Sequence, residues 1–197
     1  MLPPMLSYHL SRCRPGTKRP ILADRRGAAI VEFALVATPF VALMLAILQT
    51  SLAYFAQEAL ESAVEVSARS IVTGQAQAAD IASSGQGLTQ AQLAERFRKA
   101  ACAGLPGFMS CARLYVDVRS ATNSAGLGGN SLPLTFDSSG KPTNAFSYNL
   151  GGQGALVMVR FIYLWPMQVA PTADLNAAGT GQTVLMATSV SKSEAFT

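Results

Sequence analysis

The sequence has a single histidine, His9, and few charged residues overall. Histidine is the side chain most often used as a general acid or base near neutral pH, and His9 lies in an arginine-rich N-terminal segment. Asp80, Asp117, Asp137 and Asp174 are dispersed along the rest of the chain and show no paired spacing. We therefore expect a protein that is not an enzyme and that binds no cofactor.

The three cysteines are also too few for most metal sites. Cys13 lies near the N-terminus, and Cys102 and Cys111 lie in the second half of the chain. Two thiolates without a nearby histidine do not complete a tetrahedral zinc site, so we expect no metal. In an oxidising compartment Cys102 and Cys111 can close a small loop, which would stabilise the fold by roughly 2–3 kcal/mol. The alternative is that both remain unpaired.

Basic residues are concentrated at the N-terminus. Residues 1–27 contain six of them and one acidic residue, Asp24, for a net charge of +5, so the remaining residues carry −1 of the total of +4. The six are Arg12, Arg14, Lys18, Arg19, Arg25 and Arg26. Arg96, Arg98 and Lys99 stand beside Glu95 and are typical of a solvated helix face. This distribution excludes a nucleic-acid partner.

A long apolar run follows the basic leader. Phe33 to Leu48 contains no charged residue, and Ala28 to Leu48 as a helix matches a hydrocarbon core about 30 Å thick. Basic residues before the run place the N-terminus in the cytoplasm and the rest of the chain outside. We predict a cytoplasmic leader over residues 1–27 and a transmembrane helix over residues 28–49.

A cleaved signal peptide is the alternative interpretation of this region, with a small-residue site at Ser51-Leu52-Ala53. The apolar run is longer than the usual 7–15 residues of a signal peptide, and Glu32 lies in its first turns. Both features favour a membrane anchor that stays in the protein.

Glu32 is the unusual residue of the apolar segment, because a carboxylate inside a spanning helix is costly and usually has a partner. No lysine or arginine follows it before Arg69. The partner must therefore come from elsewhere. The alternative is that Glu32 extends to the membrane surface and needs no partner.

The residues Arg25-Arg26-Gly27-Ala28-Ala29-Ile30-Val31-Glu32-Phe33, followed by an apolar helix, resemble the N-terminus of type IV prepilins. More narrowly, they resemble the TadE-like pseudopilins of tight-adherence pili. The resemblance implies that a membrane prepilin peptidase cuts after Gly27, so that Ala28 becomes the N-terminus and Glu32 the fifth residue. It also implies a minor pilin or pseudopilin that serves adhesion and surface colonisation. Implied partners are the peptidase, the major pilin and other pseudopilins, and the inner-membrane assembly platform.

The spacing between Ala28 and Glu32 has a physical explanation in an assembly of several subunits. Cleavage creates an ammonium group at Ala28 that can face Glu32 of a neighbouring subunit, and breaking such a buried pair typically costs about 3–5 kcal/mol. Gly27 presents a peptide bond without side-chain obstruction. Glu32 and Phe33 are therefore the predicted register and assembly residues. Pro39 removes one helical hydrogen bond and predicts a kink.

The residues also allow a second function. In this alternative the chain is an uncleaved single-pass membrane protein in contact with membrane lipid, and its anchor carries a periplasmic binding or scaffold module. Both functions place the C-terminal part in the periplasm, and the pilin function also places it outside the cell within the pilus.

Beyond the membrane segment, the pattern predicts that the helix continues as an amphipathic extension over residues 50–74, with Gly74 as its C-cap. Residues at steps of three and four positions form its predicted apolar face: Leu52, Phe55, Ala59, Ala63, Val66 and Ser70. The acidic residues Glu58, Glu61 and Glu65 lie on the other side.

The exported domain is predicted over residues 75–197. Gln75 to Gly87 is typical of a linker, and Thr89 with Gln92 predicts a capping box that starts a second helix. The predicted strands are Arg113–Arg119, a short edge strand at Leu132–Phe136, Ala155–Trp165 and Gln182–Val190. We expect an α+β fold in which the long helix lies on a small antiparallel sheet with the second helix alongside.

Two glycine-containing segments resemble phosphate-binding loops only superficially. Gly140-Lys141 is followed by Pro142 where such a loop needs serine or threonine, so it predicts a turn. Gly151-Gly152-Gln153-Gly154 precedes a strand and not a helix, which favours a hairpin turn.

Overall fold

The computed structural model describes residues 27–127, 134–166 and 182–195. His9, Cys13, Asp174 and the basic residues of the leader lie outside this part of the chain. The chain divides into two compact units, Met1–Leu43 and Met44–Thr197, which are described separately. The helices are α1 (Ala28–Val72), α2 (Gln75–Ser84) and α3 (Gln90–Cys102), with the short 3₁₀ helices η3 (Cys111–Arg113) and η4 (Ser124–Leu127). The strands are β1 (Leu114–Ala121), β2 (Leu156–Pro166) and β3 (Gln182–Lys192).

In the first unit, the described residues are Gly27 and the beginning of α1, and none of them is buried. The helix continues through Pro39 without a break. Because proline has no backbone N–H, the carbonyl of Leu35 has no helical partner there. The kink at Pro39 remains a prediction.

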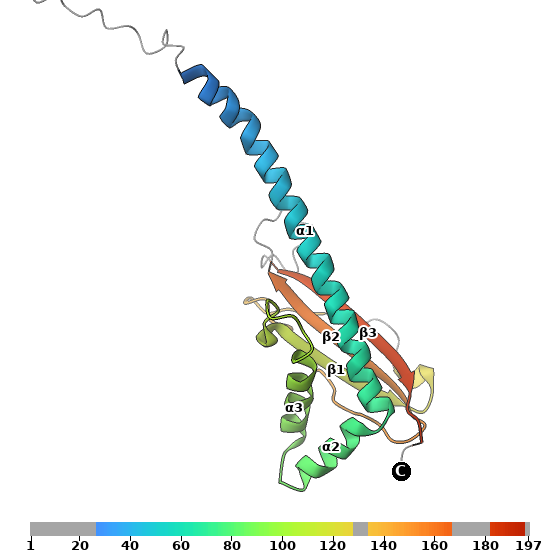
Figure 1. Ribbon diagram of the computed structural model, residues 1–197. Helices are drawn as coiled ribbons and strands as arrows, with labels where there is room; N and C mark the ends of the chain where they lie inside the picture. The colour runs from blue at the N-terminus through green and yellow to red at the C-terminus, as the bar shows by residue number, and fades with distance from the viewer. Residues whose placement is uncertain (1–26, 128–133, 167–181, 196–197) are drawn as a thin grey trace, which may run out of the picture. The chain divides into compact units, whose positions relative to one another are not determined.

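The second unit is an α+β domain, which confirms the predicted fold class (Figure 1). Its sheet has three antiparallel strands in the order β1-β2-β3. The second half of α1 packs on one face of the sheet, where Leu60 and Ile71 join Phe161 and Tyr163 in the core. The central strand β2 is buried on both faces along most of its length, as its β-branched and aromatic sequence predicts.

The predicted apolar face of α1 was wrong at its three large residues, although Ala63 is buried as expected. Leu52, Phe55 and Val66 are more than half exposed, at 52%, 55% and 70%. The observed buried face consists of Ala56, Leu60, Ala63, Val64, Ser67, Ala68 and Ile71. Both faces are apolar and differ by a small rotation, so periodicity alone does not select one. The sheet selects the face rich in alanine and serine, because small side chains leave room for the large aromatic residues of β2.

The linker predicted over Gln75–Gly87 was also wrong, because residues Gln75–Ser84 form α2. Alanine and glutamine, which dominate this segment, have high helix propensity. Gly74 is in the left-handed conformation with φ 77° and donates its N–H to the carbonyl of Ile71 at 3.1 Å, which confirms it as the C-cap of α1. The helix direction therefore changes at one glycine.

The capping box of α3 is confirmed. The Thr89 hydroxyl accepts from the N–H of Gln92, and the Gln92 side chain accepts from the N–H of Thr89. Leu93, Phe97 and Ala101 are buried, whereas Ala100 is exposed.

Strand β1 differs from its prediction on one face. In a half-buried strand that alternates Leu114, Val116 and Val118 with polar residues, Asp117 would face solvent, but it is fully buried. The segment around Ser147 covers it, because Val118 donates to the carbonyl of Ser147 at 2.8 Å and Asn149 donates to the carbonyl of Val118 at 2.9 Å. A half-buried pattern cannot reveal that a distant segment pairs with the edge of β1 and donates a hydrogen bond to this aspartate.

The predicted strand Leu132–Phe136 is not present in its described part, residues 134–136, where one isolated bridge joins Phe136 to Pro142. Its first two residues lie outside the described part. A proline at this edge limits the hydrogen bonds that a strand could form.

The two glycine segments are turns, as expected. Gly140, with φ 77°, donates to the carbonyl of Asp137. The turn at Gly151–Gly154 is not a hairpin between adjacent strands, however, because β1 ends at Ala121 and a long connection precedes β2.

Candidate processing and assembly site

Gly27 lies immediately before the first residue of α1 and is exposed. A side chain placed on Gly27 would meet no atom within 4 Å. The fold itself therefore does not require glycine at this position. A substitution here tests recognition of the Gly27–Ala28 peptide bond without disturbing the structure around it.

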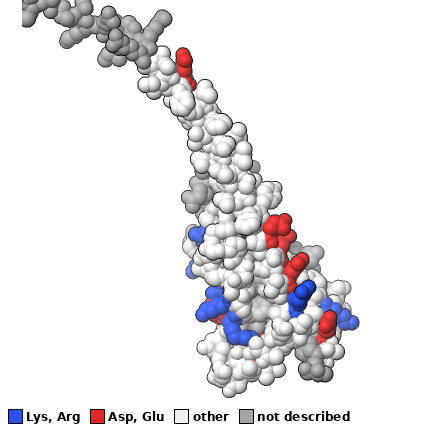
Figure 2. Space-filling view, in the orientation of Figure 1, with Lys and Arg blue, Asp and Glu red and all other residues white. Residues whose placement is uncertain are grey.

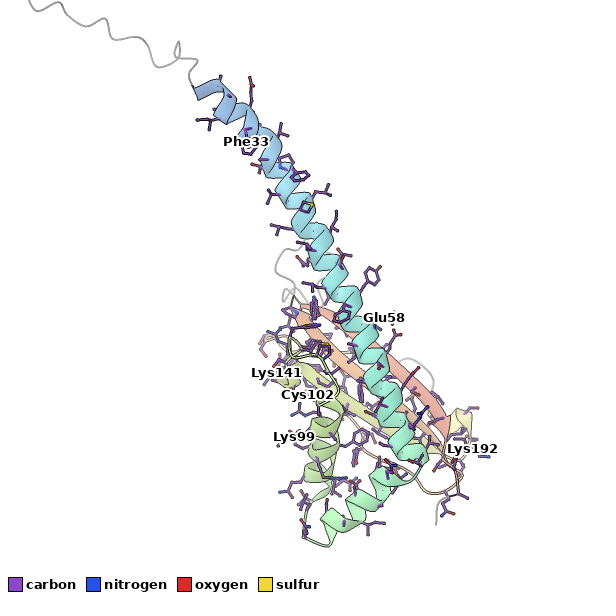
Figure 3. All side chains as sticks on the ribbon, viewed as in Figure 1. Phe33, Glu58, Lys99, Cys102, Lys141 and Lys192 are labelled. Carbon is purple, nitrogen blue, oxygen red and sulfur yellow. A yellow bond between two sulfur atoms is a disulfide. The ribbon has the colours of Figure 1, made fainter. Side chains whose placement is uncertain are left out.

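Glu32 and Phe33 lie one turn beyond Ala28 and are both exposed; Phe33 is labelled on α1 in Figure 3. The Phe33 side chain is 73% exposed. Among the residues that the structure describes, no lysine or arginine forms an ion pair with Glu32.

The exposed surface of α1 around these residues is apolar. The helix is long and apolar enough to cross a membrane, and none of its most apolar 18-residue window is buried. Three hydroxyl groups donate to the carbonyl four residues earlier: Thr38 to Ala34 at 2.7 Å, Thr50 to Ala46 at 2.9 Å and Ser51 to Ile47 at 2.8 Å. These bonds satisfy the polar atoms without water, which suits a lipid environment.

In the second unit, Cys102 and Cys111 form the predicted disulfide, with Cα atoms 5.7 Å apart. Cys102, labelled in Figure 3, is the last residue of α3 and Cys111 begins η3, just before β1. The bond therefore joins a helix to the sheet and closes the loop between them. Met109 from this loop is buried, whereas Phe108 is half exposed.

The basic residues of α3 are only partly a solvated face. Lys99 is exposed, but Arg96 forms an ion pair with Asp80 of α2, and the Tyr148 hydroxyl donates to the other oxygen of that carboxylate at 2.9 Å. Burial, followed by the hydrogen bond to Asp80, raises the pKa of Tyr148. Asp80, Arg96 and Tyr148 thus hold α2, α3 and the segment before β2 together. No local pattern in the sequence indicates that these three residues meet.

Arg98 has a separate partner on its own helix. It binds Glu95 through Nη2 and Oε1 at 2.6 Å and donates to the carbonyl of Cys111. The hydrogen bond from Arg98 lowers the pKa of Glu95. Arg98 thus also supports the disulfide-closed loop.

No group of three or more His, Cys, Asp or Glu side chains that could hold a metal ion is present in residues 27–127, 134–166 and 182–195. The structure keeps the predicted residues Gly27, Ala28, Glu32 and Phe33 on one exposed helical segment. It places Pro39 two turns further along the same helix.

The fold and this segment define an α+β protein with an exposed apolar N-terminal helix that could anchor it in a membrane. A family model described as "TadE-like protein" matches residues 27–69, which confirms the resemblance over this segment. The match begins at Gly27 and covers most of α1. No curated protein and no solved structure matches the chain.

Proposed function

We propose that this protein is a TadE-like minor pilin or pseudopilin that takes part in assembly of a tight-adherence pilus, and thereby in adhesion and surface colonisation. Its role is structural and not catalytic. The leader stays in the cytoplasm, α1 spans the inner membrane, and the α+β domain lies in the periplasm until the subunit enters the pilus. Its partners are a prepilin peptidase, the major pilin and other pseudopilins, and the assembly platform.

The observation that carries the proposal is the coincidence of the family match with the glycine before α1. The match starts at Gly27, and the helix starts at Ala28. A cut at this peptide bond would remove the whole basic leader and leave a helix with an ammonium group at its first residue. Nothing in the surrounding fold explains the glycine, because its side-chain position is open.

Glu32 would act after cleavage. Its carboxylate has no ion-pair partner among the described residues, and the new ammonium group of a neighbouring subunit is a cation of the required charge. In a low-dielectric bundle of helices an unpaired carboxylate is strongly unfavourable, so the pair would favour one stagger between subunits. The Glu32 carboxylate, which is unfavourable in the membrane when unpaired, would thus favour subunits placed so that it meets the ammonium group.

The processing step is tested by expressing the full chain in membranes that contain a prepilin peptidase. Replacing Gly27→Leu should leave the precursor uncut, whereas the wild-type chain should lose residues 1–27. Gly107→Leu is the matched control, because Gly107 is also exposed with open space at its side-chain position. Mass spectrometry reads the product, and a Gly27→Leu chain that still begins at Ala28 would contradict the proposal.

The assembly step is tested by Glu32→Gln, with Glu58→Gln as the control. Both glutamates are exposed on α1, and Glu58 is labelled in Figure 3. Glu32→Gln should be cut normally but should be lost from sheared pili, while Glu58→Gln should be retained. Normal incorporation of Glu32→Gln would remove the role assigned to that carboxylate and favour the uncleaved anchor with a binding or scaffold module.

A further inference from the structure

Three aromatic side chains from separate elements meet at one end of the domain. Phe55 of α1 lies 5.7 Å from Phe108, which follows α3, and Phe108 lies 6.2 Å from Trp165 near the end of β2, measured between ring centroids. Phe55 and Phe108 remain 55% and 50% exposed, and Trp165 is partly exposed. We call Phe55, Phe108 and Trp165 the aromatic cluster.

The cluster is held in place by the domain. The Cys102–Cys111 disulfide closes the loop that carries Phe108, and Met109 anchors this loop by inserting into the core. Trp165 lies on regular strand pairing, opposite Thr183 of β3. A fixed loop that buries Met109 and exposes the neighbouring Phe108 presents an apolar surface at low conformational cost.

This surface continues the apolar surface of α1 within the same unit. Leu48, Leu52 and Tyr54 are exposed between Met44 and the cluster, at 55%, 52% and 71%. No charged residue occurs between Glu32 and Glu58, and the visible face of this stretch of α1 is white in Figure 2. The apolar character therefore extends beyond the predicted membrane segment and ends at the aromatic rings.

The spacing along α1 matches the depth of a membrane interface. Phe55 is seven residues beyond Leu48, or about 10 Å at 1.5 Å per residue. The interfacial layer on each side of the hydrocarbon core is roughly 5–8 Å thick. Helical side chains tilt toward the helix N-terminus, which brings the Phe55 ring closer to the core than its Cα atom.

We propose that the aromatic cluster contacts the lipid of the membrane that α1 spans, at the boundary between headgroups and acyl chains. Tryptophan and other aromatic rings favour this boundary because one part of the ring is apolar and another is polar. Arg113, exposed at the same end of the sheet beside Leu114, supplies a cation for lipid phosphates. The domain therefore docks on the bilayer before the subunit leaves it.

This inference rests on the membrane-spanning part of the proposed function and not on processing or assembly. Trp165 is the only tryptophan in the chain, so its fluorescence reports on the cluster without a label. The full chain is reconstituted in vesicles of phosphatidylcholine and phosphatidylglycerol whose acyl chains carry bromine, a quencher, at a shallow or a deep position. Trp165 fluorescence should fall in both, with the larger loss from shallow bromine.

Two reporter variants on a Trp165→Phe background separate the possible failures. Ile81→Trp places the tryptophan on α2, at an exposed position after the far end of α1, and its fluorescence should not fall. Phe40→Trp places it within the membrane segment, and its fluorescence should fall most with deep bromine. Phe108→Glu on the wild-type background should reduce the quenching of Trp165, because a carboxylate disfavours the lipid contact.

Unquenched Trp165 together with quenched Phe40→Trp would overturn the docking of the cluster and leave the membrane anchor intact. Unquenched Phe40→Trp would instead show that α1 does not span the bilayer. Quenching of Trp165 that disappears as the protein-to-lipid ratio rises would show that a second copy of the chain covers the cluster in place of lipid, which would also overturn the proposal.

Discussion

Asp117 Oδ1 accepts a hydrogen bond from the backbone N–H of Ser147 at 2.8 Å, and this bond fastens the connection before β2 to the outer side of β1. Arg119 Nε lies 3.0 Å from Oδ2 of the same carboxylate, and it donates its hydrogen bond to Oδ1 at 3.3 Å. Asp117 is also directly opposite the buried Arg160 on β2. A single buried carboxylate thus accepts from a backbone donor and pairs with the Arg119 guanidinium.

Asp117→Ala should reduce the free energy of unfolding by about 2–4 kcal/mol, because it leaves the N–H of Ser147 without an acceptor and removes the ion pair with Arg119. Asp117→Asn should cost less, since its amide oxygen can still accept from Ser147. Guanidinium unfolding of the full chain in detergent, followed by Trp165 fluorescence, measures both. Equal losses in the two variants would show that the hydrogen bond to Ser147 contributes little.

Gly151 and Gly152 should respond very differently to the same substitution. Gly151 has φ +67°, and a Cβ atom there would lie 2.7 Å from Cβ of Ser120, whereas a Cβ atom on Gly152 would meet nothing within 4 Å. Gly151→Ala should therefore destabilise the domain by about 2–4 kcal/mol through strain and steric overlap. Gly152→Ala should stay within about 0.5 kcal/mol of wild type. Thermal melts compare the pair, and similar melting temperatures would contradict this turn geometry.

The disulfide should stabilise the domain by about 2–3 kcal/mol, the value expected for a loop of this length. Replacing Cys102→Ser and Cys111→Ser together should lower the unfolding midpoint, and Cys13→Ser should not. Alkylation of the unreduced, uncut precursor should modify one cysteine, Cys13. Modification of all three would show that the Cys102–Cys111 bond is absent in the purified precursor.

We expect the stability of the domain to depend on pH in the alkaline range, because Tyr148 ionises there. Burial and the bond to Asp80 raise the pKa of Tyr148 in the folded chain above the ordinary value of 10.0. Its stabilising contribution is therefore complete below pH 10 and is lost as the pH rises above that value. Tyr148→Phe should be less stable than wild type by about 1–3 kcal/mol at neutral pH, and the difference should shrink above pH 10. A difference that stays constant across this range would contradict the assignment.

The sequence predicted the elements whose patterns are strong and local. The charge-free run, the Thr89–Gln92 capping box and the β-branched run of β2 all led to elements that the structure contains. The prediction failed at α2, because its alanine and glutamine residues were interpreted from composition as a linker although both favour helix.

Long-range relationships could not be predicted in the same way. The buried face of α1 depends on which of two apolar stripes fits the sheet, and the burial of Asp117 depends on Ser147, thirty positions away in the sequence. Arg96 and Asp80 lie on different helices, so no local spacing connects them. The aromatic cluster was missed for the same reason, since its three rings come from three separate elements.

The candidate processing site was predictable because all of its residues lie within one short motif, from Gly27 to Phe33. The groups that would bind this site could not be predicted from local patterns, because the peptidase and the neighbouring subunit are separate molecules. The structure adds that the glycine is not needed for folding and that the glutamate is exposed.

N-terminal sequencing of the protein purified from the membranes of its own cells tests the central claim most directly. The account predicts that the mature chain begins at Ala28, with the basic leader removed. A chain that keeps Met1 would contradict it and leave an uncleaved anchor, and a chain that begins near Tyr54 would show that α1 is part of a secretory signal.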